Sequence, residues 1–279
     1  MIPKIIHYCW FGRGEMPPVV KWCIEGWKKK MPDYQLKLWN EDNFDVESTE
    51  WTRTAYAAKK YAFVADYVRL YALCTEGGIF LDADMKVLKP FDEFLKYDFV
   101  TSVEFYPGSA SKHYHKINPQ TLLPYTKDLY MRGLVIAAGV ILSSKSHPYI
   151  ISCLHWYQTK SYNADNENNI IIDALMAKIA EDFGFRYTPK FQYIEKYNMA
   201  IFEPDIFAFN SLHLNCKTCA IHLGIGSWKA SRNDKLLNAT NLDIYYLINY
   251  PVKSMLREIK HLFLSKKRLE EIYRYSYYK

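Results

Sequence analysis

The feature that most constrains the fold is a long apolar helical segment that runs directly into a strand. Residues 54–75 read TAYAAKKYAFVADYVRLYALCT. Beyond Lys60, apolar side chains recur at helical spacing in two neighbouring stripes: Phe63, Tyr67, Leu70 and Cys74, with Val64, Val68 and Tyr71 beside them. Most of the circumference is therefore apolar, and we predict one long, largely buried helix over 54–75.

Two glycines separate this helix from a following strand that carries a pair of aspartates. Gly77 and Gly78 end the helix, because the left-handed conformation that follows a helix favours glycine. The next residues, IFLDAD, are bulky and predict a strand. In an extended strand alternate side chains share one side, so we expect Asp82 and Asp84 to point the same way.

Strands and helices alternate elsewhere in the chain. Strand patterns at 2–8 and 34–39, with a helical stretch at 19–30 between them, form the repeating unit of a parallel α/β sheet. We also predict a strand over 97–105, a loop or short helices over 106–132, a strand pair or broken strand over 133–148, and a helix over 168–184. The fold class predicted is α/β, with a catalytic domain over 1–230 and a basic amphipathic helical segment over 231–279.

Composition and charge exclude several classes of protein. The chain has 279 residues, 49% of them hydrophobic, which suffices for one large core, and no apolar run approaches the roughly 18 residues that span a bilayer. We expect a cytoplasmic protein. The net charge is +6, and the segment 253–279 alone carries eight Lys or Arg against three Glu. The rest is close to neutral, which argues against a nucleic-acid partner and indicates one basic patch.

Cysteines and histidines near residue 220 raise the question of a zinc site. Six cysteines spread through a long chain predict reduced thiols. Cys216 and Cys219 form a C-x-x-C pair, flanked by His213 and His222. Closed zinc sites usually take their second ligand pair from farther along the chain, so buried thiols beside a strand are the favoured interpretation.

The aspartate pair itself predicts a site for a hard cation. Two carboxylates held close repel, so one must take up a proton at a raised pKa unless a cation lies between them. Mg²⁺ and Mn²⁺ accept carboxylate ligands and keep open positions that phosphate oxygens fill. A surface turn is the commonest meaning of so short a motif.

Three functional classes compete for such a site. In a nucleotide-sugar transferase, the metal stabilises the negative charge of the leaving diphosphate. A phosphohydrolase of the haloacid-dehalogenase type also places D-x-D at a strand end, but Met85 and Lys86 do not suit its next positions. A non-catalytic carbohydrate-binding protein would keep Trp10 and Trp228 without needing both aspartates.

Asp66 and Arg69 interrupt the long helix three residues apart, and hence on one face. Spacing alone favours an intrahelical ion pair on a wet edge of the helix. Glu104, near the end of the 97–105 strand, is a candidate contact for sugar or acceptor; a solvated strand end is the alternative.

Three blocks give the chain a family resemblance: IPKIIHYCWFG at 2–12, YAFVADYVRLYALCTEGGIFLDADMKVLKP at 61–90 and AIHLGIGSW at 220–228. In this order they resemble the sugar-binding DxD glycosyltransferases of family 32. That family includes bacterial capsule and O-antigen transferases and relatives of yeast mannosyltransferases, and is distantly related to the glucosylating domains of large clostridial toxins. The resemblance implies a GT-A fold, a Rossmann-like nucleotide-sugar-binding domain, here with a helical C-terminal appendage.

The resemblance also implies roles for particular residues. Asp66 would accept from hydroxyls of the donor sugar and Arg69 would approach sugar and phosphate, with Ala65 standing where the family has Ser. These two and Asp84 are the predicted catalytic residues. This match reverses the preference for a wet ion pair, because a buried Asp and Arg beside a metal site are costly unless they serve a ligand.

The implied metal ligands are Asp82, Asp84 and His222, with Mn²⁺ or Mg²⁺ as the ion. Many relatives carry a second His at the position of Leu223, so either His222 alone or water completes the shell. The remaining predicted nucleotide-sugar contacts are Tyr8, Trp10 (stacked on the base), Ala83, Ser227, Trp228 and Glu104.

The implied reaction is retaining transfer of a hexose or N-acetylhexosamine from UDP-Gal, UDP-GalNAc or UDP-Glc to a glycan. The expected acceptor is an undecaprenyl-diphosphate-linked oligosaccharide of capsule or O-antigen synthesis. Residues 251–279 would then contact the inner face of the plasma membrane; a helix packed on the domain or at a dimer contact is the alternative.

Overall fold

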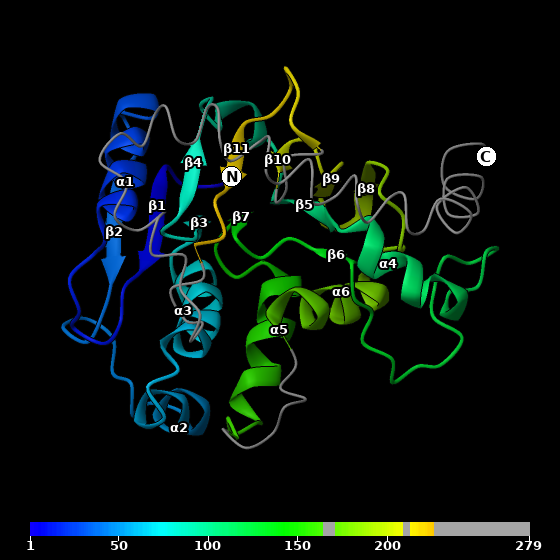
Figure 1. The fold of residues 1–279 in the computed structure, drawn as a ribbon, viewed down its shortest axis with the longest axis horizontal. Coiled ribbons are helices and arrows are strands. Elements are labelled where there is room, and N and C mark those ends of the chain that lie inside the picture. Colours follow the sequence, from blue (N-terminus) through cyan, green and yellow to red (C-terminus); the bar gives the residue numbers. More distant parts are fainter. Residues whose placement is uncertain (164–170, 209–212, 226–279) are drawn as a thin grey trace.

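The computed structural model describes residues 1–163, 171–208 and 213–225. Within these ranges the chain forms a mixed α/β fold, so the predicted class is confirmed (Figure 1). Ser227, Trp228 and the segment 231–279 lie outside the described residues. None of the helices in the described ranges is long and apolar enough to cross a bilayer.

The first half of the chain follows the predicted order closely. Its elements are β1 (Ile5–Cys9), α1 (Pro18–Lys30), β2 (Gln35–Trp39), α2 (Glu50–Ala57), α3 (Tyr61–Thr75), β3 (Gly78–Leu81) and β4 (Met85–Val87). β1 pairs in parallel with both β2 and β3. The strand–helix–strand unit predicted at the start of the chain is therefore present, with α1 as its connection.

The second half is more irregular. It contains β5 (Phe99–Phe105), α4 (Pro107–His113), β6 (Leu134–Ile136), β7 (Val140–Ser143), α5 (Pro148–Gln158), α6 (Ile172–Phe183), β8 (Gln192–Ile194), β9 (Met199–Phe202), β10 (Phe207–Ala208) and β11 (Ala220–His222), with short 3₁₀ turns at Asp92–Phe94, Tyr114–Lys116 and Glu195–Tyr197. Of the alternatives predicted over 133–148 the broken strand is present, because β6 and β7 both pair antiparallel with β5 and not with each other. Gly184 ends α6 in the left-handed conformation as expected.

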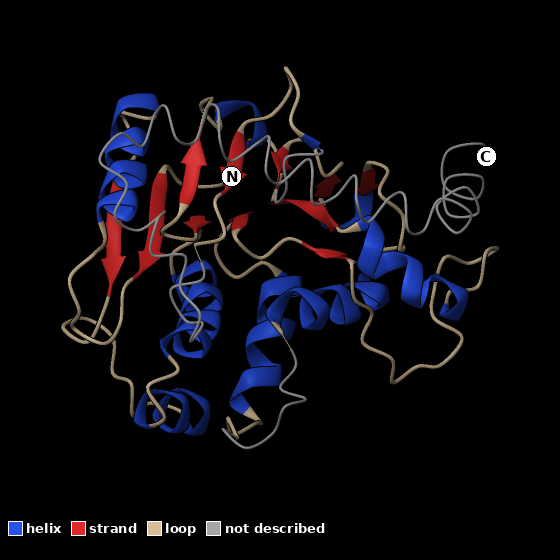
Figure 2. Cartoon of the chain, viewed as in Figure 1, coloured by secondary structure: helices blue, strands red, loops and turns tan. Residues whose placement is uncertain are grey.

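The strands form two sheets. The larger has the order β2-β1-β3-β7-β5-β9-β8, with β6 paired to β5, and the smaller has the order β10-β11-β4. Figure 2 shows the helices α2, α3, α5 and α6 gathered on one side of the strands, away from α1 and the smaller sheet. Adjacent strand residues accordingly belong to different hydrophobic clusters: Phe80 packs with the four helices, and Ile79 and Leu81 pack with α1 and β4.

The predicted helix over 54–75 is wrong in one respect, because it is two helices. α2 ends at Ala57 and α3 starts at Tyr61. Between them Lys59 has a φ of 56°, while its N–H donates to Tyr56 and the next N–H, of Lys60, donates to Ala55. These are the paired hydrogen bonds of a Schellman helix end, which glycine usually marks. Lysine at that position left no signal in the sequence.

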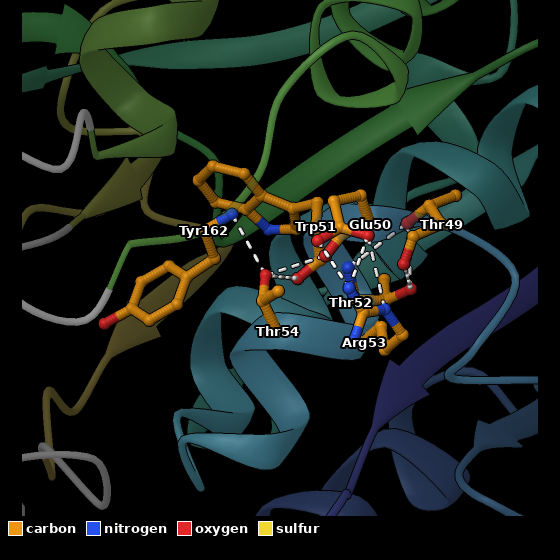
Figure 3. A network of polar contacts seen from close by, with 7 residues as sticks. All are labelled: Thr49, Glu50, Trp51, Thr52, Arg53, Thr54 and Tyr162. Carbon is orange, nitrogen blue, oxygen red and sulfur yellow. Dashed lines mark hydrogen bonds and ion pairs between the residues drawn. The ribbon is translucent and has the colours of Figure 1, made fainter.

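α2 is capped at its start and tied to a distant segment near its end (Figure 3). Thr49 is the N-cap, and its side chain accepts a hydrogen bond from the N–H of Thr52 at 3.1 Å. The hydroxyl of Thr54 accepts from the main-chain N–H of Tyr162, also at 3.1 Å. The ring of Tyr162 in turn packs edge-on against Trp51, so the chain that follows α5 is fastened to α2.

The glycine turn between α3 and β3 has the predicted conformation. Gly77 has a φ of 70° and its N–H donates to the carbonyl of Leu73, which closes the helix end. Gly78 has a φ of 112°, and a Cβ there would lie 2.6 Å from the carbonyl oxygen of Ile5 on the neighbouring strand. A side chain at 78 would therefore push β1 and β3 apart.

Replacing Gly78 by alanine tests this turn. We expect Gly78→Ala to lower the free energy of unfolding by about 2–5 kcal/mol, since a left-handed residue costs roughly 1–2 kcal/mol and overpacking roughly 1–3 kcal/mol. Urea denaturation measures the change. Gly14 is the control, because a Cβ there meets nothing within 4 Å. Equal stability of the Gly78→Ala and Gly14→Ala proteins would contradict this account.

Candidate active site

The predicted site residues gather at one edge of the larger sheet. β1 and β3 are parallel and in register through His7 and Phe80, so both strands end at this edge. β3 ends at Leu81, and the N–H of Met85 donates to the carbonyl of Asp82 at 2.9 Å. Residues 82–85 therefore form a turn, not the continued strand that the sequence predicts. The two aspartates reach the same side through this turn and not through strand alternation.

His222 lies directly over the two aspartates. Its Nε2 is 3.2 Å from Oδ1 of Asp84 and 4.0 Å from Oδ2 of Asp82. The antiparallel pairing of β11 with β4 places His222 opposite Met85, the last residue of the turn. The three predicted metal ligands, separated by about half of the chain in sequence, are thus brought together by the smaller sheet.

Asp84 is also held by the backbone that follows His222. Its Oδ2 accepts the N–H of Ile225 at 2.9 Å, and its carbonyl accepts the N–H of Leu223 at 3.2 Å. Burial raises the pKa of Asp84, but the His222 imidazole and the Ile225 N–H outweigh burial and hold it below its ordinary value. Asp84 is therefore a carboxylate at neutral pH.

Asp66 and Arg69 form an ion pair that is buried and not on a wet edge. Arg69 is 5% exposed and Asp66 is 8% exposed. The guanidinium donates from Nη2 to Oδ1 of Asp66 and from Nη1 to the carbonyl of Ala138, both at 2.8 Å, and Nη1 lies 3.3 Å from Oδ1 of Asp82. It also lies over the ring of Phe80, 4.7 Å from the centroid. Arg69 thus links α3 to the turn that carries Asp82 and Asp84.

Among the residues that the structure describes, carboxyl groups outnumber cations around this centre. Arg69 and His222 are surrounded by five acidic side chains: Asp66, Asp82, Asp84, Glu104 and Asp173. Burial, opposed by Arg69, raises the pKa of Asp66 to about 7, and burial likewise raises that of Asp82. Burial lowers the pKa of His222, but Asp84 and Asp82 outweigh it and raise the value to about 9. The site as a whole therefore attracts a cation.

Two carboxylates and one imidazole form a donor set that suits Mn²⁺ better than Mg²⁺, since Mg²⁺ prefers oxygen ligands. In the present arrangement these groups pair with one another, and no three His, Cys, Asp or Glu side chains of the described ranges converge as metal ligands do. The alternative zinc group is not assembled either: Cys216 is exposed while Cys219 is buried. Of these two cysteines, only Cys219 is the buried thiol that the favoured interpretation expects.

Glu104 and Asp173 are two further carboxyl groups of this centre. Burial and the neighbouring Asp173 raise the pKa of Glu104 well above its ordinary value, and the two side chains hydrogen-bond each other. Glu104 is thus no solvated strand end. Asp173, in the first turn of α6, accepts the N–H of Ala138 at 2.9 Å. No sequence pattern marks this contact, because an acidic residue at a helix start is ordinary.

The remaining predicted contacts lie along the same edge or outside the described residues. Trp10 follows β1 and donates from Nε1 to the carbonyl of Gly14 at 2.7 Å. Tyr8 is half-buried with its ring edge-on to Trp27, and Ala83 packs against the α1 side of the core. Ser227 and Trp228 are not described.

Comparison with known proteins identifies a family model that covers part of this site. Residues 17–100 match the family model described as "Glycosyltransferase sugar-binding region containing DXD motif". This range contains Asp66, Arg69, Asp82 and Asp84 but neither Trp10 nor His222. The resemblance is therefore confirmed at the level of a DXD sugar-binding region, over that part of the chain.

Two curated fungal proteins are similar to parts of the chain. The chain is 36% identical over 106 residues to inositol phosphoceramide mannosyltransferase 3 of Schizosaccharomyces pombe, covering 34% of this chain and 28% of that protein. It is 45% identical over 51 residues to glucan organizing enzyme 1 of Cryptococcus neoformans, covering 18% and 14%. The chain thus spans less than a third of either relative.

Solved glycosyltransferase structures are similar at low scores. PaToxG glycosyltransferase is 17% identical with a TM-score of 0.43, covering 65% of this chain and 69% of that chain. The galactosyltransferase LgtC, in complex with donor and acceptor sugar analogs, is 11% identical with a TM-score of 0.41, covering 78% and 86%.

The titration of His222 tests the described site without any ligand. In metal-free protein we expect the imidazole to titrate near pH 9 and not near its ordinary 6.5. Because the folded value is the higher one, the ion pair stabilises the protein fully below pH 6.5, and this stabilisation, on the order of 3 kcal/mol, is lost as the pH rises through 9. Side-chain NMR measures the pKa directly.

The variant Asp84→Asn should move the pKa of His222 back toward 6.5. Asp42→Asn is the matched control, because Asp42 pairs with Arg13 on the exposed surface. A pKa of His222 below 7 in the wild-type protein would contradict the ion pair with Asp84.

Proposed function

We propose that this protein is a metal-dependent glycosyltransferase that moves a hexose or N-acetylhexosamine from a UDP-sugar to a glycan acceptor. The donors proposed are UDP-Gal, UDP-GalNAc and UDP-Glc. One observation carries the proposal: Asp82 and Asp84 meet His222 beside the buried Asp66–Arg69 pair, and both aspartates lie within the stretch matched to a DXD sugar-binding region. The GT-A type of fold is part of the same proposal.

Asp66 and Arg69 are proposed to bind different parts of the donor. Asp66 is buried and lies beside Arg69, where a carboxyl group with a pKa near 7 can accept from or donate to a sugar hydroxyl. Arg69 keeps its charge at all relevant pH values, because the surrounding carboxylates raise its pKa above its ordinary value despite burial. It is placed to bind the phosphate and to stabilise charge that develops on it.

Asp82, Asp84 and His222 would hold the metal ion. A bound Mn²⁺ or Mg²⁺ supplies positive charge to the leaving diphosphate and so favours cleavage of its bond to the sugar. His222 would have to give up its proton to solvent before it could serve as a ligand, which would make binding of the ion dependent on pH. Trp10, at the end of β1, is proposed to stack on the base.

Retention of anomeric configuration is proposed to follow a front-face route. A double-displacement route needs a carboxylate nucleophile beside the anomeric carbon. Glu104 is poorly suited to that role, since burial and the neighbouring Asp173 raise its pKa well above its ordinary value and so favour its protonated form. The leaving diphosphate is therefore proposed to take the proton of the acceptor hydroxyl, while Arg69 stabilises the diphosphate charge.

The acceptor and the cellular setting are also proposed. A lipid-linked glycan of capsule or O-antigen synthesis, carried on undecaprenyl diphosphate, would bring the enzyme to the cytoplasmic face of the plasma membrane. The basic segment 251–279 offers the positive charge that an anionic surface attracts. Liposome co-sedimentation with and without the residues after Pro251 tests this attachment, and equal binding by both proteins would refute it.

Mannose transfer is the second candidate. It is favoured by the 36% identity to a protein named as an inositol phosphoceramide mannosyltransferase. A phosphohydrolase and a non-catalytic carbohydrate-binding protein remain the alternatives from other classes. The first would release phosphate from simple esters without any acceptor, and the second would bind sugars without turnover.

Donor turnover is the decisive measurement. With Mn²⁺ and a panel of UDP- and GDP-sugars, we expect release of nucleoside diphosphate from one hexose donor and faster release when a lipid-linked glycan is added. Release from a GDP-mannose donor alone would select the second candidate. If no donor is consumed with any acceptor while simple phosphate esters are hydrolysed, the transferase is excluded.

Removal of the metal or of Asp84 should abolish this turnover. We expect chelation by EDTA to stop it and added Mn²⁺ to restore it. Asp84→Asn should lower kcat/KM at least about 100-fold, the effect of losing one charged group that stabilises a transition state. Asp42→Asn should leave the rate unchanged. Full activity of Asp84→Asn at micromolar Mn²⁺ would contradict the metal assignment.

A further inference from the structure

The short connection between β6 and β7 holds two parts of the site with its backbone. It consists of Ala137, Ala138 and Gly139, all without functional side chains. The carbonyl of Ala138 accepts from Nη1 of Arg69 at 2.8 Å, and the carbonyl of Gly139 accepts the N–H of Asp82 at 2.9 Å. One stretch of three residues therefore sets both the guanidinium and the first aspartate of the D-x-D pair.

This connection is itself held from two sides. The hydroxyl of Thr101 on β5 donates to the carbonyl of Ala137 at 2.7 Å. On the other side the N–H of Ala138 donates to Oδ1 of Asp173 at 2.9 Å. Ala138 is 1% exposed, so its N–H has no access to water and depends on a protein acceptor.

Asp173 reaches out of its own helix to make this contact. It lies in the first turn of α6, where an acidic side chain ordinarily serves the free N–H groups of the same helix. Its Oδ1 instead accepts a hydrogen bond from a residue 35 positions away. The N-cap of α6, Ile171, has no capping side chain, so the helix start gains no cap from this arrangement.

We propose that Asp173 is a positioning residue of the donor site, which acts by holding the 137–139 connection so that its carbonyls orient Arg69 and Asp82. Only the kinetic test of this inference rests on the proposed function. Asp173 does not touch the metal ligands through its Oδ1; its effect passes through one peptide group to Arg69. A displacement of the order of 1 Å in a group that orients substrate can cost about 100-fold in rate.

Two substitutions at Asp173 separate hydrogen bonding from charge. Asp173→Asn keeps a carbonyl oxygen at the same reach and removes the charge, so it should keep the hydrogen bond from the Ala138 N–H and impair kcat less than Asp173→Glu does. Asp173→Glu keeps the charge but moves the acceptor by one methylene, so it should lower kcat about 10- to 100-fold, as loss of an outer-shell partner does. The donor KM should change less than kcat, because charge that develops in the transition state is affected most.

Asp182 provides the matched control, since it is an exposed residue of the same helix. Asp182→Asn and Asp182→Glu should both leave kcat and KM unchanged. Calorimetric titration with UDP and Mn²⁺ counts the molecules competent to bind, so that a partly unfolded variant is distinguished from one with a slower step.

Hydrogen exchange gives a readout that does not depend on activity. The amide of Ala138 should exchange slowly in the wild-type protein and in Asp173→Asn, and faster in Asp173→Glu. The order of the two variants decides the matter: if Asp173→Asn is the more impaired, or if Asp173→Glu leaves kcat and the Ala138 amide unchanged, the positioning role is refuted.

Failure of the proposed function would look different. In that case the wild-type protein would consume no nucleotide sugar, yet the exchange of the Ala138 amide would still report whether Asp173 holds the connection. Retention of slow exchange in Asp173→Glu would refute the inference even then.

Discussion

A buried guanidinium is the interaction on which the rest of the site depends. Removing Arg69 from water costs several kcal/mol, and only several partners at once can offset that cost. Asp66, Asp82, the carbonyl of Ala138 and the ring of Phe80 supply them. Because these partners come from α3, the turn after β3, the connection after β6 and a central strand, satisfying one cation fixes four separate parts of the fold relative to one another.

The electrostatics around this cation support the proposal that an anionic donor binds together with a metal ion. Five acidic side chains surround two cationic ones, and burial raises the pKa of several of them. In that proposal the ionised Asp84 would repel a diphosphate, whereas a divalent ion held by Asp82 and Asp84 would relieve the repulsion between these two groups and attract the phosphates. In the metal-free protein the protonated His222 takes the place of such an ion and pairs with Asp84 and Asp82.

Local sequence predicted the parts of the fold that local physics determines. The apolar stripes of α3, the glycines at 77 and 78 and the alternation of β1, α1 and β2 all appear as expected. The break at Lys59 does not, because lysine has no preference for the left-handed conformation that it adopts there. The turn over 82–85 replaces the end of the predicted strand, although aspartate suits a turn as well as a strand end. Asp173 was missed for a related reason: its partner, Ala138, offers only a main-chain N–H, which no sequence pattern marks.

The amino-acid sequence by itself determined which chemistry this chain carries: a D-x-D pair directly after a helix bearing Asp and Arg, and a histidine far along the chain. Only the tertiary structure decided that these groups meet. The antiparallel pairing of β11 with β4 brings His222 over Asp84, and burial turns an ordinary Asp66–Arg69 pair into a site with shifted pKa values. Proximity and desolvation are properties of the folded chain, and no order of residues expresses them before the sheets form.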